Sequence, residues 1–319
     1  MKNLISYIKD KYFKEYHGDI EYIVRSGLRG ENGFIIIYFY SNGIPICVGK
    51  ISRKDKSLIE TEKRNILQMG TVLKTSKLRN TLENVIEMLD VYGYDILLKE
   101  FKEGINADVY IKDEKQEKIR SVVNSSCEWL TQFINDTKEY HIVSTDKKYE
   151  VAKGLIRNNL KNDWIETFIK DKKYFLSPSH GDLTLSNILM KNGKISAVVD
   201  YENFTHEGFP IADFIGIIVS IGTFLYEHTD HMINITFLEN NWFSELIYIQ
   251  ISEFCNIFGL DYCEFVNIMP QYSDRALLLS EKWNMKNMFN YHVKLKSCFI
   301  EKKDDILKQL IYINKNKMC

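Results

Sequence analysis

The chain has 319 residues, of which 45% are hydrophobic, and a formal net charge of −1, which is typical of a globular protein with room for two lobes and their cores. Its six cysteines are scattered without a CxxC pair, which argues against a zinc site or a disulfide framework and fits a reducing cytoplasm. The N-terminus lacks the apolar core of a signal peptide, and the most apolar run, residues 209–226, is too short and too interrupted for a membrane span.

Three strands are predicted near the N-terminus. Residues 20–24, 33–40 and 44–51 are rich in β-branched and aromatic side chains, and Asn42-Gly43 turns the chain between the last two. The segment between the first two strands carries glycines, which would let backbone N–H groups approach phosphates. A glycine-bearing hairpin without a ligand is the alternative, because the spacing is not GxGxxG. The candidate phosphate-binding residues are Ser26, Gly27 and Gly30.

Lys50, at the end of the third strand, has a predicted acidic partner. Residues 57–69 indicate a helix with an apolar stripe, and Glu62 falls on that stripe. An acid on an apolar face needs a partner, and Lys50 is the natural one. Glu60 lies off the stripe and is the second choice. The stripe consists of Leu58, Ile66 and Met69.

Two further strands and a helical region follow. Residues 85–92 and 94–101 read as strands, and residues 119–170 are predicted to be mostly helical, with apolar stripes that belong to a core. The apolar run over residues 209–226 is predicted to be a buried helix.

Between His180 and Asp200 the chain reads HGDLTLSNILMKNGKISAVVD. Asn192-Gly193 is a strong two-residue hairpin signal, because both positions tolerate a positive φ, and it separates two apolar runs. With this turn at the tip, Asn187 pairs with Val198, so Asp200 lies two residues beyond that partner. Since strand side chains alternate with period two, Asn187 and Asp200 are predicted to project from the same face.

These polar residues supply the parts of a phosphoryl-transfer site. An amide and a carboxylate on one face can converge on one hard cation, so Asn187 and Asp200 are candidate magnesium ligands beside the phosphates of a nucleotide. Asp182, in the loop before the hairpin, would accept a proton from an attacking hydroxyl. His180 is predicted to be a structural hydrogen-bonding residue. The alternative, a surface hairpin flanked by ordinary acids, does not account for the ordered occurrence of all these features.

Three motifs carry a family resemblance: HGDLTLSNIL, then VVDYEN, then GFPIADF. Over residues 178–216 the chain resembles the aminoglycoside phosphotransferase and choline kinase family, relatives of the protein kinases. The resemblance implies that Asp182 is the catalytic base, that Asn187 and Asp200 bind magnesium, and that Asp213 is structural. Family members often have His two residues after the HGD aspartate, where this chain has Thr184.

The resemblance also implies a fold. It is an α+β, two-lobe protein-kinase-like fold with a small antiparallel-sheet lobe and a larger, mainly helical lobe. Residues 1–101 would form the nucleotide-binding lobe, and residues 102–319 the catalytic and substrate-binding lobe, with ATP or GTP between them.

Two nucleotide contacts follow from the same likeness. Lys50 resembles the kinase lysine that contacts the α- and β-phosphates, with Glu62 as its partner. Residues 97–104 resemble a kinase hinge, where main-chain groups near Glu100 and Phe101 would hold adenine. An edge strand that meets a loop is the plain alternative for that run.

No Lys or Arg occurs from Ile195 to Asp274, an 80-residue stretch that contains twelve acidic and fifteen aromatic residues. Chain-average usage predicts roughly ten cations there. A lobe of this kind has a negative field and π-faces that attract a cationic substrate. A buried aromatic core with acids on its outer face is the alternative. The candidates for substrate contact are Glu202, Glu207, Glu239, Glu245, Asp274 and Glu281.

The sequence therefore predicts an enzyme, a magnesium-dependent kinase that transfers the γ-phosphoryl group of ATP or GTP to a hydroxyl of a cationic small molecule. An aminoglycoside is the first choice, which implies antibiotic resistance, followed by choline or another small amine and then a neutral metabolite such as a sugar or homoserine. A protein of a different functional class, a nucleotide-binding regulatory module without catalysis, is the alternative. The presence of Asp182, Asn187 and Asp200 together argues against it, because such a module does not need a catalytic base. A nucleic-acid partner is disfavoured because the acidic lobe repels phosphates. Neither a membrane nor an oligomer is implied, and the expected location is cytoplasmic.

Overall fold

The computed structural model describes residues 2–12, 20–26, 33–53, 55–91, 93–148, 150, 175–282 and 284–317. It divides into two compact units. The first comprises Met1–Glu103 together with Ala197–Glu202, and the second comprises Gly104–Ser196 and Asn203–Cys319. The short stretch Ala197–Glu202 belongs to the first unit although it is distant in sequence, and Val198 pairs there with Leu82 in a parallel bridge.

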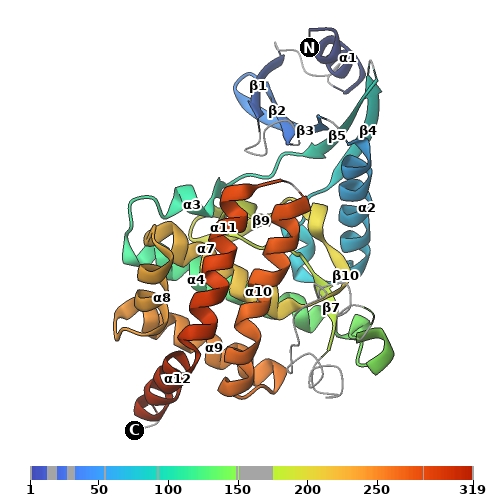
Figure 1. The fold of residues 1–319 in the computed structure, drawn as a ribbon. Coiled ribbons are helices and arrows are strands. Elements are labelled where there is room, and N and C mark those ends of the chain that lie inside the picture. The colour runs from blue at the N-terminus through green and yellow to red at the C-terminus, as the bar shows by residue number, and fades with distance from the viewer. Residues whose placement is uncertain are drawn as a thin grey trace. The chain divides into compact units, whose positions relative to one another are not determined.

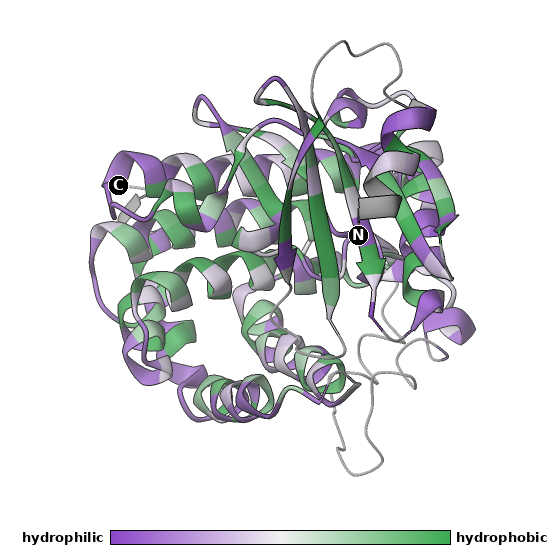
Figure 2. Ribbon diagram, turned by 90° about the horizontal axis from the view of Figure 1, so that it is seen from above, coloured by the Kyte–Doolittle hydropathy of each residue, from purple (hydrophilic) through white to green (hydrophobic). Residues whose placement is uncertain are grey.

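The first unit is built on a five-stranded antiparallel sheet, with strand order β1-β2-β3-β5-β4. Its central strands are largely hydrophobic (Figure 2). Two helices, α1 and α2, belong to the same unit (Figure 1). The elements are β1 (Ile20–Ser26), β2 (Phe34–Ser41), β3 (Ile44–Ser52), β4 (Val85–Val91), β5 (Tyr94–Glu100), α1 (Lys2–Tyr12) and α2 (Lys56–Val72).

Local sequence explains these elements. Asn42 and Gly43 both have positive φ, 52° and 75°, which is the backbone of the two-residue turn predicted between β2 and β3. Helix α2 begins after Asp55, whose carboxylate accepts the Ser57 N–H at 2.9 Å and so satisfies one of the free donors at the helix start. The core of the sheet is formed by Ile37, Phe39, Ile96, Leu98 and their neighbours. All five strands and the helix over residues 57–69 were predicted from the sequence.

Helices form most of the second unit, and α10 packs along α11 (Figure 1). Helix α7, which was predicted over residues 209–226, is buried along most of its length. Predicted helical residues from 151 onward lie outside the described residues. Among the described residues of this unit, the helices include α3 (Ala107–Tyr110), α4 (Gln116–Asp136), α7 (Pro210–Leu225), α8 (Thr229–Phe237), α9 (Trp242–Phe258), α10 (Tyr262–Lys282), α11 (Lys286–Glu301) and α12 (Lys303–Lys317).

Two small sheets occur among the described residues in addition to the five-stranded one. One has the order β6-β8-β9 and the other pairs β10 with β7. Asn192 and Gly193, with φ of 52° and 74°, form the predicted turn between β8 and β9, and the Ser196 hydroxyl donates to the Leu189 carbonyl across this hairpin at 3.1 Å. The strands are β6 (Ile105–Asn106), β7 (Ser177–Ser179), β8 (Ile188–Lys191), β9 (Lys194–Val198) and β10 (Thr205–Gly208).

Within the part of the chain that the structure describes, no single helix has the length and apolar character to cross a membrane. Helices α7 and α8 have enough length and apolar character only when they are taken together, and the chain bends by 116° at the break between them.

Candidate active site

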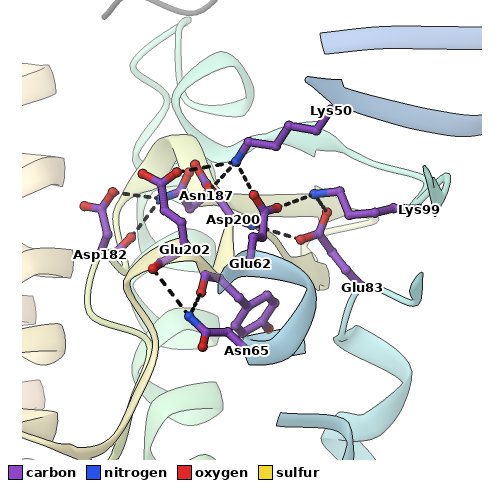
Figure 3. A network of polar contacts seen from close by, with 10 residues as sticks. Lys50, Glu62, Asn65, Glu83, Lys99, Asp182, Asn187, Asp200 and Glu202 are labelled. Carbon is purple, nitrogen blue, oxygen red and sulfur yellow. Dashed lines mark hydrogen bonds and ion pairs between the residues drawn. The ribbon is translucent and has the colours of Figure 1, made fainter. Parts of the chain in front are cut away.

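Lys50 and Glu62 form a buried ion pair in the first unit (Figure 3). Strand β3 presents Lys50 toward helix α2, and the Lys50 Nζ lies 2.6 Å from Glu62 Oε2. The ammonium also lies 4.0 Å from the centre of the Phe34 ring, a distance at which a cation is attracted to the ring face. The structure thus brings together the two residues that the helix stripe predicted as partners. Glu60, the second choice, is exposed.

Asp200 and Glu202 surround the same ammonium. Asp200 Oδ1 lies 2.8 Å from Lys50 Nζ, and Glu202 Oε2 lies 3.6 Å from it. The turn that carries Glu202 is tied to helix α2, because the Asn65 side-chain amide donates to the Tyr201 carbonyl at 2.8 Å. Glu202, a candidate for substrate contact, follows the end of β9 in a short 3₁₀ turn and is buried.

The geometric argument that placed Asn187 and Asp200 on one face was wrong. It assumed that both residues lie in paired strands, but Asn187 ends a 3₁₀ turn before β8 and Asp200 follows the end of β9. Asp200 also has a φ of 69°, in the left-handed region, so period-two alternation does not extend to it. Their convergence on one ion remains a prediction.

Sequence reasoning missed Lys99 and Glu83. Lys99 Nζ lies 2.8 Å from Glu62 Oε1 and 2.6 Å from Glu83 Oε1, and all three side chains are buried. Lys50 pairs with Leu97 across β3 and β5, so Lys99, two residues further along β5, shares the sheet face of Lys50. The available signal was a lysine that directly follows the apolar run Ile96-Leu97-Leu98, since a buried cation requires a partner.

The network carries an excess of negative charge. Two ammonium groups, on Lys50 and Lys99, meet four carboxylates, so the ionised network has a net charge of −2. Burial alone lowers the pKa of each lysine, yet the net shift is upward because the carboxylates outweigh it, so both ammonium groups stay charged. The four carboxylates are those of Glu62, Glu83, Asp200 and Glu202.

A hard divalent cation fits this donor set. Oxygens of Glu62, Asp200 and Glu202 lie within 4.8 Å of one another, and magnesium prefers oxygen ligands. A charge of +2 would balance the excess of −2 in the network. Of the three carboxylates, Asp200 is the most exposed, with 30% of its side chain accessible, and it is therefore the one most open to an entering ion.

In the second unit, Asp213 holds the HGD loop in place. Its Oδ2 accepts the Ser179 hydroxyl and the His180 N–H, each at 2.8 Å, and its Oδ1 accepts the Gly181 N–H at 2.8 Å. Gly181 has a φ of 85°, and a Cβ there would lie 2.2 Å from the Asn203 carbonyl oxygen, so only glycine fits. His180 is buried, and its Nδ1 accepts the Asp182 N–H at 3.4 Å. These hydrogen bonds are the contacts expected of the structural roles predicted for His180 and Asp213.

Asp182 and Asn187 are in contact. The Asn187 side-chain nitrogen donates to the Asp182 carbonyl at 2.8 Å and to Asp182 Oδ2 at 3.3 Å (Figure 3). Because the nitrogen end of the amide is engaged by Asp182, the Asn187 oxygen is the end available to a cation. The same contact orients the carboxylate of Asp182, which is partly exposed and able to meet a hydroxyl.

The other predicted nucleotide contacts are described only in part. Glu100 ends β5; its N–H donates to the Asn84 carbonyl at 2.9 Å, and its carboxylate accepts the Asn84 side chain at 2.7 Å. That N–H is therefore not available to a base, whereas Phe101 lies beyond the strand. Gly27 and Gly30 lie outside the described residues, and Ser26 is described only as the last residue of β1. The binding roles of all five stay predictions.

Apart from Glu202, the five acids proposed for substrate contact fall into two groups. Glu207 lies 3.2 Å from Lys147, and Asp274 pairs with Lys296, so cations from outside the cation-free stretch neutralise both. The other group consists of Glu239, Glu245 and Glu281, which are exposed.

The aromatic residues of the same stretch are mostly core. Ten of the fifteen are buried, among them Phe214, Phe254 and Phe258, which stack in sequence with ring centroids 4.1 Å and 4.5 Å apart. Exposed acids, rather than π-faces, are therefore the feature of this stretch that a cationic ligand would meet.

The sheet-based unit with its Lys–Glu pair and the helical unit with its HGD loop define a protein-kinase-like fold of two lobes. A solved structure that is similar to this chain is an aminoglycoside-3'-phosphotransferase of type VIII, with a TM-score of 0.50 and 11% identity, over 86% of this chain and 98% of that chain. The aminoglycoside phosphotransferase APH(3'')-Id from Streptomyces rimosus ATCC10970 gives a TM-score of 0.49 and 13% identity, over 86% of this chain and 98% of that chain. The same enzyme in complex with ADP and streptomycin gives a TM-score of 0.49 and 12% identity, over 86% of this chain and 99% of that chain. No protein-family model matches the sequence, and no curated protein matches it. The predicted fold class is confirmed, and the resemblance to aminoglycoside phosphotransferases holds at the level of the fold.

Proposed function

We propose that this protein is a small-molecule kinase that transfers the γ-phosphoryl group of ATP or GTP to a hydroxyl of a cationic substrate. The observation that carries the proposal is the Lys50 ammonium held between Glu62 and Asp200, at 2.6 and 2.8 Å. A buried lysine fixed on a strand by a helix glutamate is the arrangement with which kinases engage the α- and β-phosphates.

Each residue has a distinct part in the proposed reaction. Asp182 orients the substrate hydroxyl and accepts its proton, and Asn187 keeps the Asp182 carboxylate in position through its side-chain nitrogen. Lys50 binds the α- and β-phosphates, and Glu62 fixes its ammonium. Asn187 and Asp200 would hold magnesium, which would supply positive charge to the phosphates. Main-chain groups near Glu100 and Phe101 and the segment with Ser26, Gly27 and Gly30 complete the proposed nucleotide contacts.

The proposed substrate class follows from charge. The stretch from Ile195 to Asp274 contains no cation of its own, and Glu239 and Glu245 are exposed acids with no ion-pair partner among the residues described. Several separated carboxylates suit an aminoglycoside, the substrate class named for the type VIII enzyme of similar fold, and resistance to such antibiotics in the cytoplasm would follow. Choline or another small amine is the second candidate and a neutral metabolite the third.

The experiment has two stages. Calorimetric titration with ATP and with GTP, each with and without magnesium, should give binding that strengthens when magnesium is present. A panel of aminoglycosides, small hydroxyl-bearing amines and neutral sugars is then scored by nucleotide consumption and by mass spectrometry for a substrate gain of one phosphoryl group. Binding without turnover of any panel member favours the regulatory module. Absence of magnesium-dependent nucleotide binding contradicts the proposal altogether.

A further inference from the structure

The polar contacts of the first unit form a closed ring that begins and ends at Asp200. Lys50 contacts the Asp200 side chain at 2.8 Å, and Glu62 joins Lys50 to Lys99 through its two oxygens. Lys99 contacts Glu83 Oε1 at 2.6 Å, and Glu83 Oε2 accepts the backbone N–H of Asp200 at 3.0 Å. Asp200 is therefore held twice, by its carboxylate and by its main chain (Figure 3).

The backbone contact lies where it has most effect. Asp200 has a φ of 69°, a conformation that L-residues other than glycine seldom adopt and that costs free energy unless the surroundings impose it. The hydrogen bond from its N–H to a carboxylate is charge-assisted, and such bonds are shorter and stronger than neutral ones. Glu83 thus stabilises the backbone conformation that decides where the Asp200 carboxylate points.

Lys99 keeps Glu83 in the ionised, oriented form that this bond needs. Both side chains are nearly inaccessible, at 6% and 7%, and a buried carboxylate without a cation partner is strongly disfavoured. Because Lys99 also takes one oxygen of Glu62, the second oxygen of Glu62 stays with Lys50. The pair therefore acts on both Lys50 and Asp200, which the proposed reaction uses.

We propose that Glu83 and Lys99 are positioning residues that fix the Asp200 backbone and thereby set the affinity of the protein for the magnesium–nucleotide complex. The effect on nucleotide affinity rests on the proposed kinase function. The effect on the Asp200 backbone concerns the ligand-free protein and can be tested without a nucleotide. Replacing Glu83 by Gln disturbs both contacts at once. The single remaining oxygen turns to the Lys99 ammonium, and the new NH₂ group faces the Asp200 N–H, donor against donor.

The first test needs no nucleotide. Hydrogen–deuterium exchange is followed in a peptide that covers residues 199–202 of the full-length protein, for wild type, Glu83→Gln and Glu87→Gln. Glu87 is a matched control, because it lies on the neighbouring β4 and pairs with Lys11 at 3.0 Å in an exposed ion pair. Exchange at Asp200 should accelerate at least tenfold in Glu83→Gln and stay unchanged in Glu87→Gln. Equal exchange in wild type and Glu83→Gln overturns the proposal.

The second test asks whether Glu83 acts through Asp200. In the calorimetric titration, Glu83→Gln should weaken magnesium-dependent nucleotide binding about 10- to 100-fold, the range typical of residues that orient a metal ligand. In an Asp200→Ala background the same substitution should have a much smaller effect, because the carboxylate that Glu83 positions is gone and only the indirect influence on Lys50 through Lys99 and Glu62 remains. Equal weakening in both backgrounds indicates a general structural role and contradicts the proposal.

A third variant removes the whole Glu83–Lys99 pair. Glu83→Gln combined with Lys99→Met also takes from buried Glu62 one of its two cations, so the unfolding midpoint should stay at or below that of Glu83→Gln. Amide exchange and magnesium dependence should stay impaired as well, because the carboxylate that holds the Asp200 N–H is still absent. Recovery of wild-type affinity in this double variant refutes the positioning role. A wild-type protein that binds nucleotide independently of magnesium refutes the proposed function, while the exchange experiment still decides whether Glu83 holds Asp200.

Discussion

Replacing Asp213 by Asn should unfold the HGD loop more readily and slow the proposed reaction. Asp213 is 2% exposed and accepts three hydrogen bonds, from the Ser179 hydroxyl and from the N–H groups of His180 and Gly181. An Asn side chain has one oxygen in place of two. In its better orientation it keeps the two bonds to one oxygen and turns its NH₂ group toward the Gly181 N–H.

The cost follows from these contacts. One charge-assisted bond is lost, which is worth about 1.5–3 kcal/mol, and a buried N–H and a buried NH₂ group are left facing each other, each costing about 1–3 kcal/mol. Partial relaxation reduces the sum, so the free energy of unfolding should fall by about 3–5 kcal/mol. Because Asp182 directly follows Gly181, the loosened loop should also lower kcat.

Urea denaturation followed by circular dichroism measures the loss of stability. Asp230→Asn is the matched control, since Asp230 pairs with Lys294 in an ion pair whose side chains are 55% and 53% exposed, and such pairs contribute at most about 1 kcal/mol. If Asp213→Asn and Asp230→Asn lower stability by the same small amount, the three bonds do not hold the loop, and the reasoning fails.

Two more predictions concern single residues. Gly181→Ala should lower the free energy of unfolding by more than about 2 kcal/mol, because an alanine at this position adopts a left-handed φ and its Cβ clashes with the Asn203 carbonyl. Gly43 has a similar φ but open space around it, so Gly43→Ala should lower the free energy of unfolding by only about 1 kcal/mol. Equal urea midpoints for the two variants would contradict this difference. Burial lowers the pKa of His292 to about 4. The imidazole ring contacts the rings of Tyr272 and Tyr291, and burial raises the pKa of both tyrosines, so these neighbours are uncharged as well. His292 is therefore neutral in the folded protein at pH values at which it begins to protonate, near pH 6.5, in the unfolded chain. Stability should therefore be complete above pH 6.5 and fall by about 1.4 kcal/mol per pH unit toward pH 4. His292→Gln should remove this component of the decline, and an identical pH dependence in the variant would contradict it.

The contacts that the sequence predicted share one property. Lys50 and Glu62 were paired because a helical period of 3.6 placed Glu62, and not Glu60, on the apolar stripe, and the structure joins them at 2.6 Å. The Asn192-Gly193 turn was predictable because few dipeptides accept two positive φ angles. In both cases local chemistry alone decides the geometry.

The contacts that the sequence did not predict depend on tertiary structure. Glu83 and Lys99 meet because β5 lies between β3 and β4 and presents Lys99 on the face of Lys50, which no local pattern specifies. The left-handed backbone of Asp200 ends the strand alternation from which its direction was inferred. Glu207 and Asp274 were candidate substrate contacts because cations are absent nearby in sequence, but Lys147 and Lys296 reach them from elsewhere in the chain.

The most direct test of the kinase assignment is phosphoryl transfer by the wild-type protein and by Asp182→Asn, measured with a substrate from the panel under saturating magnesium and nucleotide. Asn keeps the volume of Asp182 and its contact with Asn187 but cannot accept the proton of the hydroxyl. The account predicts that kcat falls by about 10²- to 10⁴-fold while nucleotide affinity changes less than threefold. Full turnover in Asp182→Asn would contradict it.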